Sequence, residues 1–244
     1  MSKILTVEAK LFLREPAALL FALLLPLVLL LGLGSLPRFQ EAVPELGGQR
    51  IIDTHFPSMM MLLGLITLAF TVMPATLATY RESGVLRRMS TTPVRAGRLL
   101  TAQLLINVVV AVLASTILTV LGWAVLDIGL PREPLGFAVS FVLGGASLFA
   151  LGLLIASISP TAKAAPGIGT VLMFPLMFIS GMWVPRESMP EVLRQIGDFL
   201  PVAPFGQALR DTWAGHAPNP RDLVVMAATV LIAGGAAARL FRWE

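Results

Sequence analysis

The stretch LLTAQLLINVVVAVLASTILTVLGWAVL, from Leu99 to Leu126, contains 28 consecutive residues without a charged side chain. An α-helix rises 1.5 Å per residue, so about 20 apolar residues cross the roughly 30 Å hydrocarbon core of a bilayer. This run therefore predicts a membrane-spanning helix.

Five further uncharged runs are long enough, or nearly so, to cross a bilayer. They predict a single all-α integral membrane domain over residues 1–244 with six transmembrane helices. The first run ends without a small-residue cleavage pattern, which favours a spanning helix over a secretory signal peptide. The expected spans are 17–36, 56–79, 99–126, 135–158, 164–184 and 223–241.

The first fifteen residues differ from the spans because they are charged on one side. On a helical wheel Lys3, Lys10 and Arg14 form one stripe, while Ile4 and Leu11 lie on another side. This pattern is typical of an amphipathic helix that lies in the membrane interface. Residues 1–15 therefore predict an N-terminal interface helix.

The whole composition agrees with a lipid environment. Of 244 residues, 56% are hydrophobic and 13% are charged, whereas a soluble domain carries about 25% charged residues. The net charge of +4 and the pI of about 10.3 would fit nucleic-acid binding, but here the basic residues flank apolar runs and set topology instead. We expect contact with membrane lipid and none with nucleic acid.

The positive charges also orient the chain. With the N terminus in the cytoplasm, the inner connections and termini hold eleven of the eighteen lysines and arginines. Cytoplasmic segments of membrane proteins are enriched in these residues. Both termini are therefore expected on the cytoplasmic side of a plasma membrane.

The connection between the second and third spans, residues 80–98, reads YRESGVLRRMSTTPVRAGR and carries five arginines and one glutamate. Ser83, Val85, Leu86 and Met89 are able to form a short amphipathic helix, which Pro93 would end. Such a helix at the cytoplasmic surface suits a subunit that takes a mechanical push from a soluble partner. An arginine cluster that only contacts anionic headgroups fits the spacing equally well.

Two regions of the chain resemble the ABC-2 type transporter permeases, which include bacterial drug exporters. The segments RESGVLRRM and TPVRAGRLL, between the second and third spans, are similar to the coupling helix of that family. The segment SGMWVPRESMPEVLRQIGDFLPVAPFGQALRDTW, residues 180–213, resembles the family's stretch after the fifth span, with its proline-flanked short helices. With the six-span layout, the resemblance covers essentially the whole chain.

The resemblance implies one half of an exporter in the bacterial plasma membrane. Two permeases, either identical copies or paralogues, would pair with two nucleotide-binding ATPase subunits, and the substrate would cross between the permeases. It assigns ATPase coupling to the residues of one short segment: Glu82, Ser83, Gly84, Val85, Leu86, Arg87, Arg88 and Met89.

The same resemblance implies short re-entrant helices in the outer region 185–222. The residues expected to form an outer gate there are Pro185, Met189, Leu193, Phe199 and Pro204. From the residues alone, the helical spacing of the apolar positions in this region fits an interfacial helix that seals the outer surface equally well.

The chain shows no catalytic chemistry of its own. It lacks a G-x-x-x-x-G-K-[ST] phosphate loop, so ATP and Mg²⁺ are expected on the partner subunit. We expect no catalytic residue, cofactor or metal in this chain, and thus no enzyme activity of its own. Apart from Arg239 at the end of the last expected span, the spans lack ionisable groups, which argues against an ion-coupled secondary transporter. That class and a membrane scaffold or assembly component remain the alternatives.

A substrate pathway would lie among residues of the spans. Gln103 and Asn107 are four apart on one face, which favours hydrogen bonds between helices, with a polar pathway lining as the alternative. Methionines and phenylalanines favour core packing, or alternatively an adaptable apolar binding surface. The candidate pathway residues are Met59, Met60, Phe70, Gln103, Asn107, Met173, Phe174 and Phe178.

The expected cargo follows from the scarcity of stacking side chains. A glycan pathway would profit from aromatic surfaces, but the chain has one tyrosine and four tryptophans. We therefore expect a hydrophobic or amphipathic compound that is drug-like or lipid-like.

Overall fold

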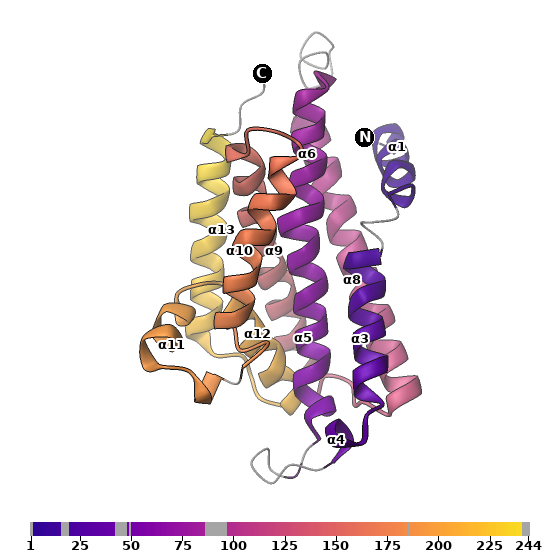
Figure 1. Cartoon of the computed structure of the whole chain (residues 1–244), viewed down its shortest axis with the longest axis vertical. Coiled ribbons are helices and arrows are strands. Elements are labelled where there is room, and N and C mark those ends of the chain that lie inside the picture. The colour runs from indigo at the N-terminus through magenta and orange to yellow at the C-terminus, as the bar shows by residue number, and fades with distance from the viewer. Residues whose placement is uncertain are drawn as a thin grey trace.

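The computed structural model describes residues 2–15, 20–41, 48, 50–85, 97–184 and 186–240. Over these ranges the chain is helical and forms no β-strand, which confirms the all-α class. The long helices stand side by side along the long axis of the molecule (Figure 1). In chain order the elements are α1 (Ser2–Leu13), η1 (Leu20–Leu24), α3 (Leu25–Gly34), α4 (Pro37–Gln40), α5 (Ile51–Thr67), η3 (Leu68–Val72), α6 (Met73–Glu82), α8 (Gly97–Leu126), α9 (Pro134–Ile158), α10 (Ala164–Ile179), η4 (Arg186–Ser188), α11 (Glu191–Asp198), α12 (Val202–Ala214) and α13 (Pro220–Leu240).

Four helices in the described part of the chain are long and apolar enough to cross a membrane. They are the continuous helix from Ile51 to Glu82, formed by α5, η3 and α6, and the helices α8, α9 and α13. The first and fifth expected spans correspond to shorter apolar helices, Leu20–Gly34 and Ala164–Ile179. The structure thus has several helices that are long and apolar enough to cross a membrane, and the count of six spans stays a prediction.

Several helix ends differ from the expected span limits for local reasons. The helix expected from residue 56 begins at Ile51, because the main-chain N–H of Arg50 donates to the Asp53 carboxylate and caps the first turn (3.2 Å). Its other end continues to Glu82, so the connection 80–98 starts with helical residues. The fifth helix stops at Ile179, where Ser180 and Gly181 form a turn.

The two ends of the helix bundle carry different elements. Figure 1 shows α1, the end of α6 and the end of α13 together at one end, which we call the α6 end. The short helices α4, α11 and α12 lie towards the opposite end, which we call the α12 end. Because α1 and the end of α13 share one end, the arrangement is compatible with an even number of spans.

Helix α12 is the most deeply buried short element in the described part of the chain. Val202, Phe205 and Leu209 are fully buried against α5 and α9. The indole N–H of Trp213 donates to the Gly129 carbonyl (2.9 Å) and joins α12 to the α8–α9 connection. Helix α12 thus fills the space beside α5 and α9 at this end of the bundle.

The long Ile51–Glu82 helix changes its winding halfway. The π-helical turn η3 lies directly before Met73 and Pro74, and Pro74 lacks the N–H that would bond the Phe70 carbonyl in an α-helix. Helices α9 and α10 both pack closely against the backbone of this turn, and each has a glycine at the point of contact. A Cβ at Gly152 of α9 would lie 2.0 Å from the Ala69 carbonyl oxygen, and one at Gly169 of α10 would lie 1.6 Å from that of Phe70.

We predict that Gly169→Ala destabilises the protein by about 1–3 kcal/mol, because the added methyl group must displace the backbone of η3. Gly167→Ala is the matched control, since a methyl group there meets no atom within 4 Å. The midpoint of thermal unfolding of the detergent-solubilised protein measures both. Equal midpoints for the two variants would contradict the backbone contact.

Candidate functional site

A cavity of about 540 Å³ lies between the first apolar helix, the long Ile51–Glu82 helix and α10. We call this cavity the α10 groove. Residues from η1 and α3 form one wall, residues from α5, η3 and α6 form the floor, and α10 forms the other wall. The lining residues are Glu15, Phe21, Leu25, Leu29, Leu63, Thr67, Thr71, Val72, Ala75, Pro166, Thr170, Met173, Phe174, Met177 and Trp183.

The chemistry of the α10 groove is apolar with few polar atoms. The hydroxyl groups of Thr67, Thr71 and Thr170 donate to carbonyls four residues earlier in their own helices, at 2.7, 2.6 and 2.8 Å. They are therefore already satisfied as donors and offer only acceptor lone pairs to a ligand. Such a surface holds an apolar body and leaves orientation to a small number of polar contacts.

Large apolar side chains around the α10 groove are exposed in the single chain. Phe174 of α10 is 55% exposed and Phe21 of η1 is 51% exposed. Val171, Leu172 and Phe178 continue the apolar surface along α10. A helix that is apolar on all sides is buried in lipid or against another protein, so this face of the bundle suits the bilayer or a second copy.

The structure places the predicted pathway residues in different surroundings. Met173 and Phe174 line the α10 groove. Phe178 is exposed on α10 and Met59 is half-buried, whereas Met60 and Phe70 are buried in the core. Gln103 and Asn107 are buried on α8, which does not border the groove.

Sequence reasoning missed the threonines of the α10 groove. Thr67 and Thr71 are four residues apart and therefore lie on the same face of the helix, so their spacing was a usable signal. Trp183 lies beyond the end of α10, and only the fold brings it to the groove.

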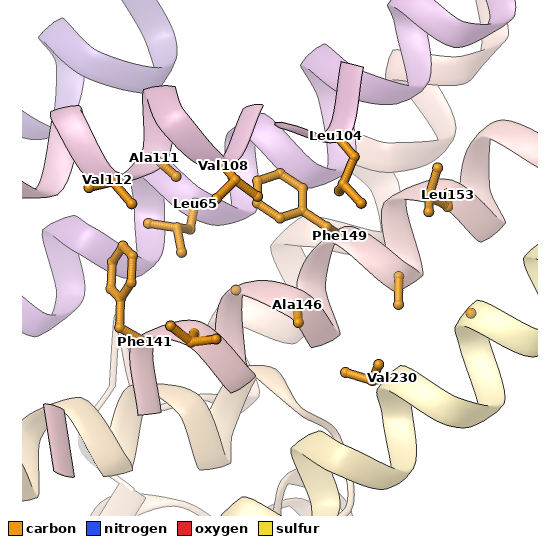
Figure 2. Close-up of a pocket in the computed structure, with 14 residues that line it drawn as sticks. Leu65, Leu104, Val108, Ala111, Val112, Phe141, Ala146, Phe149, Leu153 and Val230 are labelled. Atoms are coloured by element: carbon orange, nitrogen blue, oxygen red, sulfur yellow. The ribbon is translucent and has the colours of Figure 1, made fainter. Parts of the chain in front are cut away.

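A second cavity of about 360 Å³ lies between α8, α9 and α13. Figure 2 shows Phe141 and Phe149 of α9 among aliphatic side chains, and every lining side chain is built of carbon alone. Without a hydrogen-bonding side chain this cavity has little means of orienting a ligand, so we favour the α10 groove as the functional site. Among the described residues, no three His, Cys, Asp or Glu side chains are grouped to hold a metal ion.

At the α6 end, a buried carboxylate joins three helices. Glu8 of α1 is only 6% exposed. The Tyr80 hydroxyl donates to the Glu8 Oε2 atom (2.6 Å), and the Gln103 side-chain amide donates to the same oxygen. Gln103 Nε2 also lies 3.2 Å from the Tyr80 hydroxyl. This Glu8 cluster ties the N-terminal helix to α6 and α8.

Gln103 and Asn107 therefore have different surroundings. Gln103 makes the hydrogen bonds between helices that its position in the sequence favours. The Asn107 amide donates to the main-chain carbonyl of Gln103 (2.9 Å), while its Oδ1 atom is buried without a hydrogen-bond partner among the described residues.

The predicted coupling residues are only partly within the described residues. Leu86, Arg87, Arg88 and Met89 lie outside them. Helix α6 ends at Glu82, and Ser83 and Gly84 form a turn, for which the positive φ of Gly84 (68°) suits glycine. The Glu82 carboxylate accepts a hydrogen bond from the main-chain N–H of Ala162 (2.9 Å), in the connection between α9 and α10.

The predicted outer-gate residues within the described part of the chain differ in exposure. Met189 and Pro204 are buried, Leu193 is half-buried, and Phe199 is exposed. The Arg221 guanidinium lies over the Phe199 ring, 5.3 Å from its centre. Pro185 lies outside the described residues. Prolines 190 and 201 directly precede α11 and α12, as the proline-flanked pattern predicts.

We predict that Tyr80→Phe lowers stability by about 1–3 kcal/mol, because the Glu8 carboxylate loses a donor while it stays buried. Thr79→Val is the matched control, since the exposed Thr79 hydroxyl bonds only within its own helix. Thermal unfolding in detergent measures both variants. A Tyr80→Phe protein as stable as the control would show that the Glu8 cluster does not hold α1.

Comparisons with known proteins identify the family of the chain. Residues 3–213 match the family model of the ABC-2 type transporter. A curated relative, the "Putative transport permease YvfS" of Bacillus subtilis (strain 168), is 26% identical over 226 residues, which cover 92% of this chain and 90% of the relative. The chain belongs to the ABC-2 type transporter family.

Proposed function

We propose that this chain is the membrane-spanning permease subunit of an ATP-binding cassette exporter. It moves a hydrophobic or amphipathic, drug-like or lipid-like compound out of the cell along the α10 groove. The observation that carries this proposal is the groove itself, which runs from Glu15, just after α1, to Trp183, beyond the far end of α10. A path along the spans is what a transported apolar compound needs.

The α10 groove is open on the face where η1, α3 and α10 expose apolar side chains. A second permease, either a copy of this chain or a paralogue, faces this surface, so that two grooves together form the pathway. Phe21, Phe174 and Trp183 are each about half exposed at the groove in the single chain. Burial of these side chains against a second subunit would remove them from lipid and add packing contacts.

Energy enters from a separate ATPase that binds at the α6 end. The segment Glu82 to Met89 docks this ATPase, which supplies the ATP and Mg²⁺ site that the chain lacks. The α6 end is then cytoplasmic, with both termini on that side of the bacterial plasma membrane. The Glu8 cluster supports this role because it attaches the N-terminal helix to α6, directly before the docking segment.

We predict that Phe174→Ala lowers ATP-dependent transport of a lipophilic rhodamine dye about tenfold, since a groove side chain contributes about 1–3 kcal/mol when an apolar molecule buries it. The assay uses liposomes that contain the permease and its ATPase. Val171→Ala is the matched control, because Val171 is exposed on the same helix but does not line the groove. Equal loss of transport in both variants would contradict a pathway along the α10 groove.

We also predict that Arg87→Ala combined with Arg88→Ala reduces co-purification of the ATPase, because two cations are lost from the docking segment. Arg132→Ala, in the connection before α9 at the α12 end, is the control and leaves co-purification unchanged. Unchanged ATPase binding in the double variant would refute the docking assignment.

The same liposomes distinguish the two alternatives. Dye flux driven by an imposed ion gradient without ATPase would indicate a secondary transporter. ATPase binding without any ATP-dependent flux would indicate a scaffold.

A further inference from the structure

The last two residues of α6 hold the connection between α9 and α10. The Arg81 guanidinium donates to the main-chain carbonyls of Ala156 (3.3 Å) and Ser159, at the end of α9. The Glu82 carboxylate accepts from the main-chain N–H of Ala162, just before α10. We call these contacts the 81–82 clamp.

Each half of the 81–82 clamp matches the electrostatics of a helix end. The last carbonyls of α9 have no partner within the helix, and a cation such as Arg81 is stabilised at this negative end. The main-chain N–H of Ala162 lies just before α10, and an anion such as Glu82 is stabilised near this positive helix end. Hydrogen bonds with a charged partner are about twice as strong as neutral ones.

The connection that the clamp holds is short and internally bonded. It runs from Ser159 to Lys163, between the end of α9 and the start of α10. The Ala164 main-chain N–H donates to the Thr161 hydroxyl (3.1 Å), and that of Ala165 donates to the Thr161 carbonyl (3.1 Å). A displacement of this connection therefore passes directly into the first turn of α10.

Helix α10 is also a wall of the α10 groove. Its side chains Pro166, Thr170 and Met173 line the groove from the first turn onward, and Ala75 of α6 lines it from the floor. The 81–82 clamp thus connects the segment that follows α6 to the part of the structure that shapes the groove.

We infer that Arg81 and Glu82 are positioning residues that make the end of α6 and the 159–163 connection one moving unit. A push by the ATPase on the segment after Glu82 then moves α10 together with α6 and changes the width of the groove. This inference rests on the proposed function. The inference also gives the Glu82 side chain a contact within the chain, whereas the family resemblance alone implies a contact with the ATPase.

Loss of the clamp is expected to separate ATP hydrolysis from transport. In liposomes with the ATPase, Arg81→Ala and Glu82→Ala each raise the ATP hydrolysed per rhodamine molecule transported about tenfold, the factor that corresponds to loss of one charge-assisted hydrogen bond. ATPase co-purification stays unchanged in Arg81→Ala, because Arg81 lies outside the segment proposed to dock the ATPase. Arg81→Lys keeps the charge without the planar fork and restores coupling in part.

Thr79→Ala is the matched control for these variants. Thr79 lies in the last turns of the same helix, outside the docking segment, and its hydroxyl bonds to the Ala75 carbonyl of its own helix (2.8 Å). The ratio of hydrolysis to transport in Thr79→Ala equals that of the unaltered protein. An unchanged ratio in Arg81→Ala and Glu82→Ala overturns the clamp, and so does loss of ATPase binding in Arg81→Ala, which would place Arg81 in the docking contact.

Cross-linking tests the same inference by replacing the Glu82 contact with a covalent link. The chain contains no cysteine, so Glu82→Cys with Ala162→Cys provides a unique pair for a short bifunctional thiosulfonate reagent. Cross-linking restores the coupling that the Glu82→Cys substitution loses if the two sites move together. Loss of transport that a reductant reverses shows that they move apart and overturns the inference.

A second pair shows that the assay detects restricted motion. Phe21→Cys with Phe174→Cys places cysteines on opposite walls of the α10 groove, and a reagent that joins them is expected to stop the transport that remains in the unlinked double-cysteine protein. Absence of ATP-driven transport by the unaltered protein refutes the proposed function and the role of the clamp together. Normal transport with free movement at the clamp refutes the clamp alone.

Discussion

Hydrogen bonding of the backbone inside an apolar solvent is the constraint on which the rest of this structure depends. In lipid every N–H and C=O group needs a partner within the protein, so the spanning segments are helical. The central Ile51–Glu82 helix departs from regular winding only at η3 and Pro74. There Gly152 and Gly169 allow α9 and α10 to pack directly on its backbone. The positions of α9 and α10, and with them one wall of the groove, follow from these two close approaches.

The α6 end is organised by polar side chains instead. Three successive residues, Tyr80, Arg81 and Glu82, bond to α1 with α8, to the end of α9 and to the residues before α10. Successive side chains on a helix point about 100° apart, so adjacent residues reach different neighbours. One turn of α6 therefore contacts α1, the end of α9 and the residues before α10.

The division between an apolar groove and a polar end suits the proposed exporter. The groove is lined mostly by carbon, together with Glu15 and with threonine hydroxyls that bond within their own helices. It therefore recognises size and apolar surface more than a pattern of hydrogen bonds, which suits hydrophobic cargo. The polar contacts that could transmit force lie at the α6 end, where charges are partly exposed to water and can bind a soluble partner.

The sequence by itself determined that the chain lies in lipid, that it is helical and which family it belongs to. The length of an uncharged run can be compared with the thickness of a bilayer without knowing which segments pack against that run. Only the tertiary structure decided that Gln103 meets Glu8 and Tyr80, that Glu82 turns to Ala162, and that Met173 but not Met60 lines the groove. These contacts depend on how each helix is rotated about its axis. Helices that are apolar on all sides carry no periodic pattern that reveals this rotation, so packing between distant segments settles it.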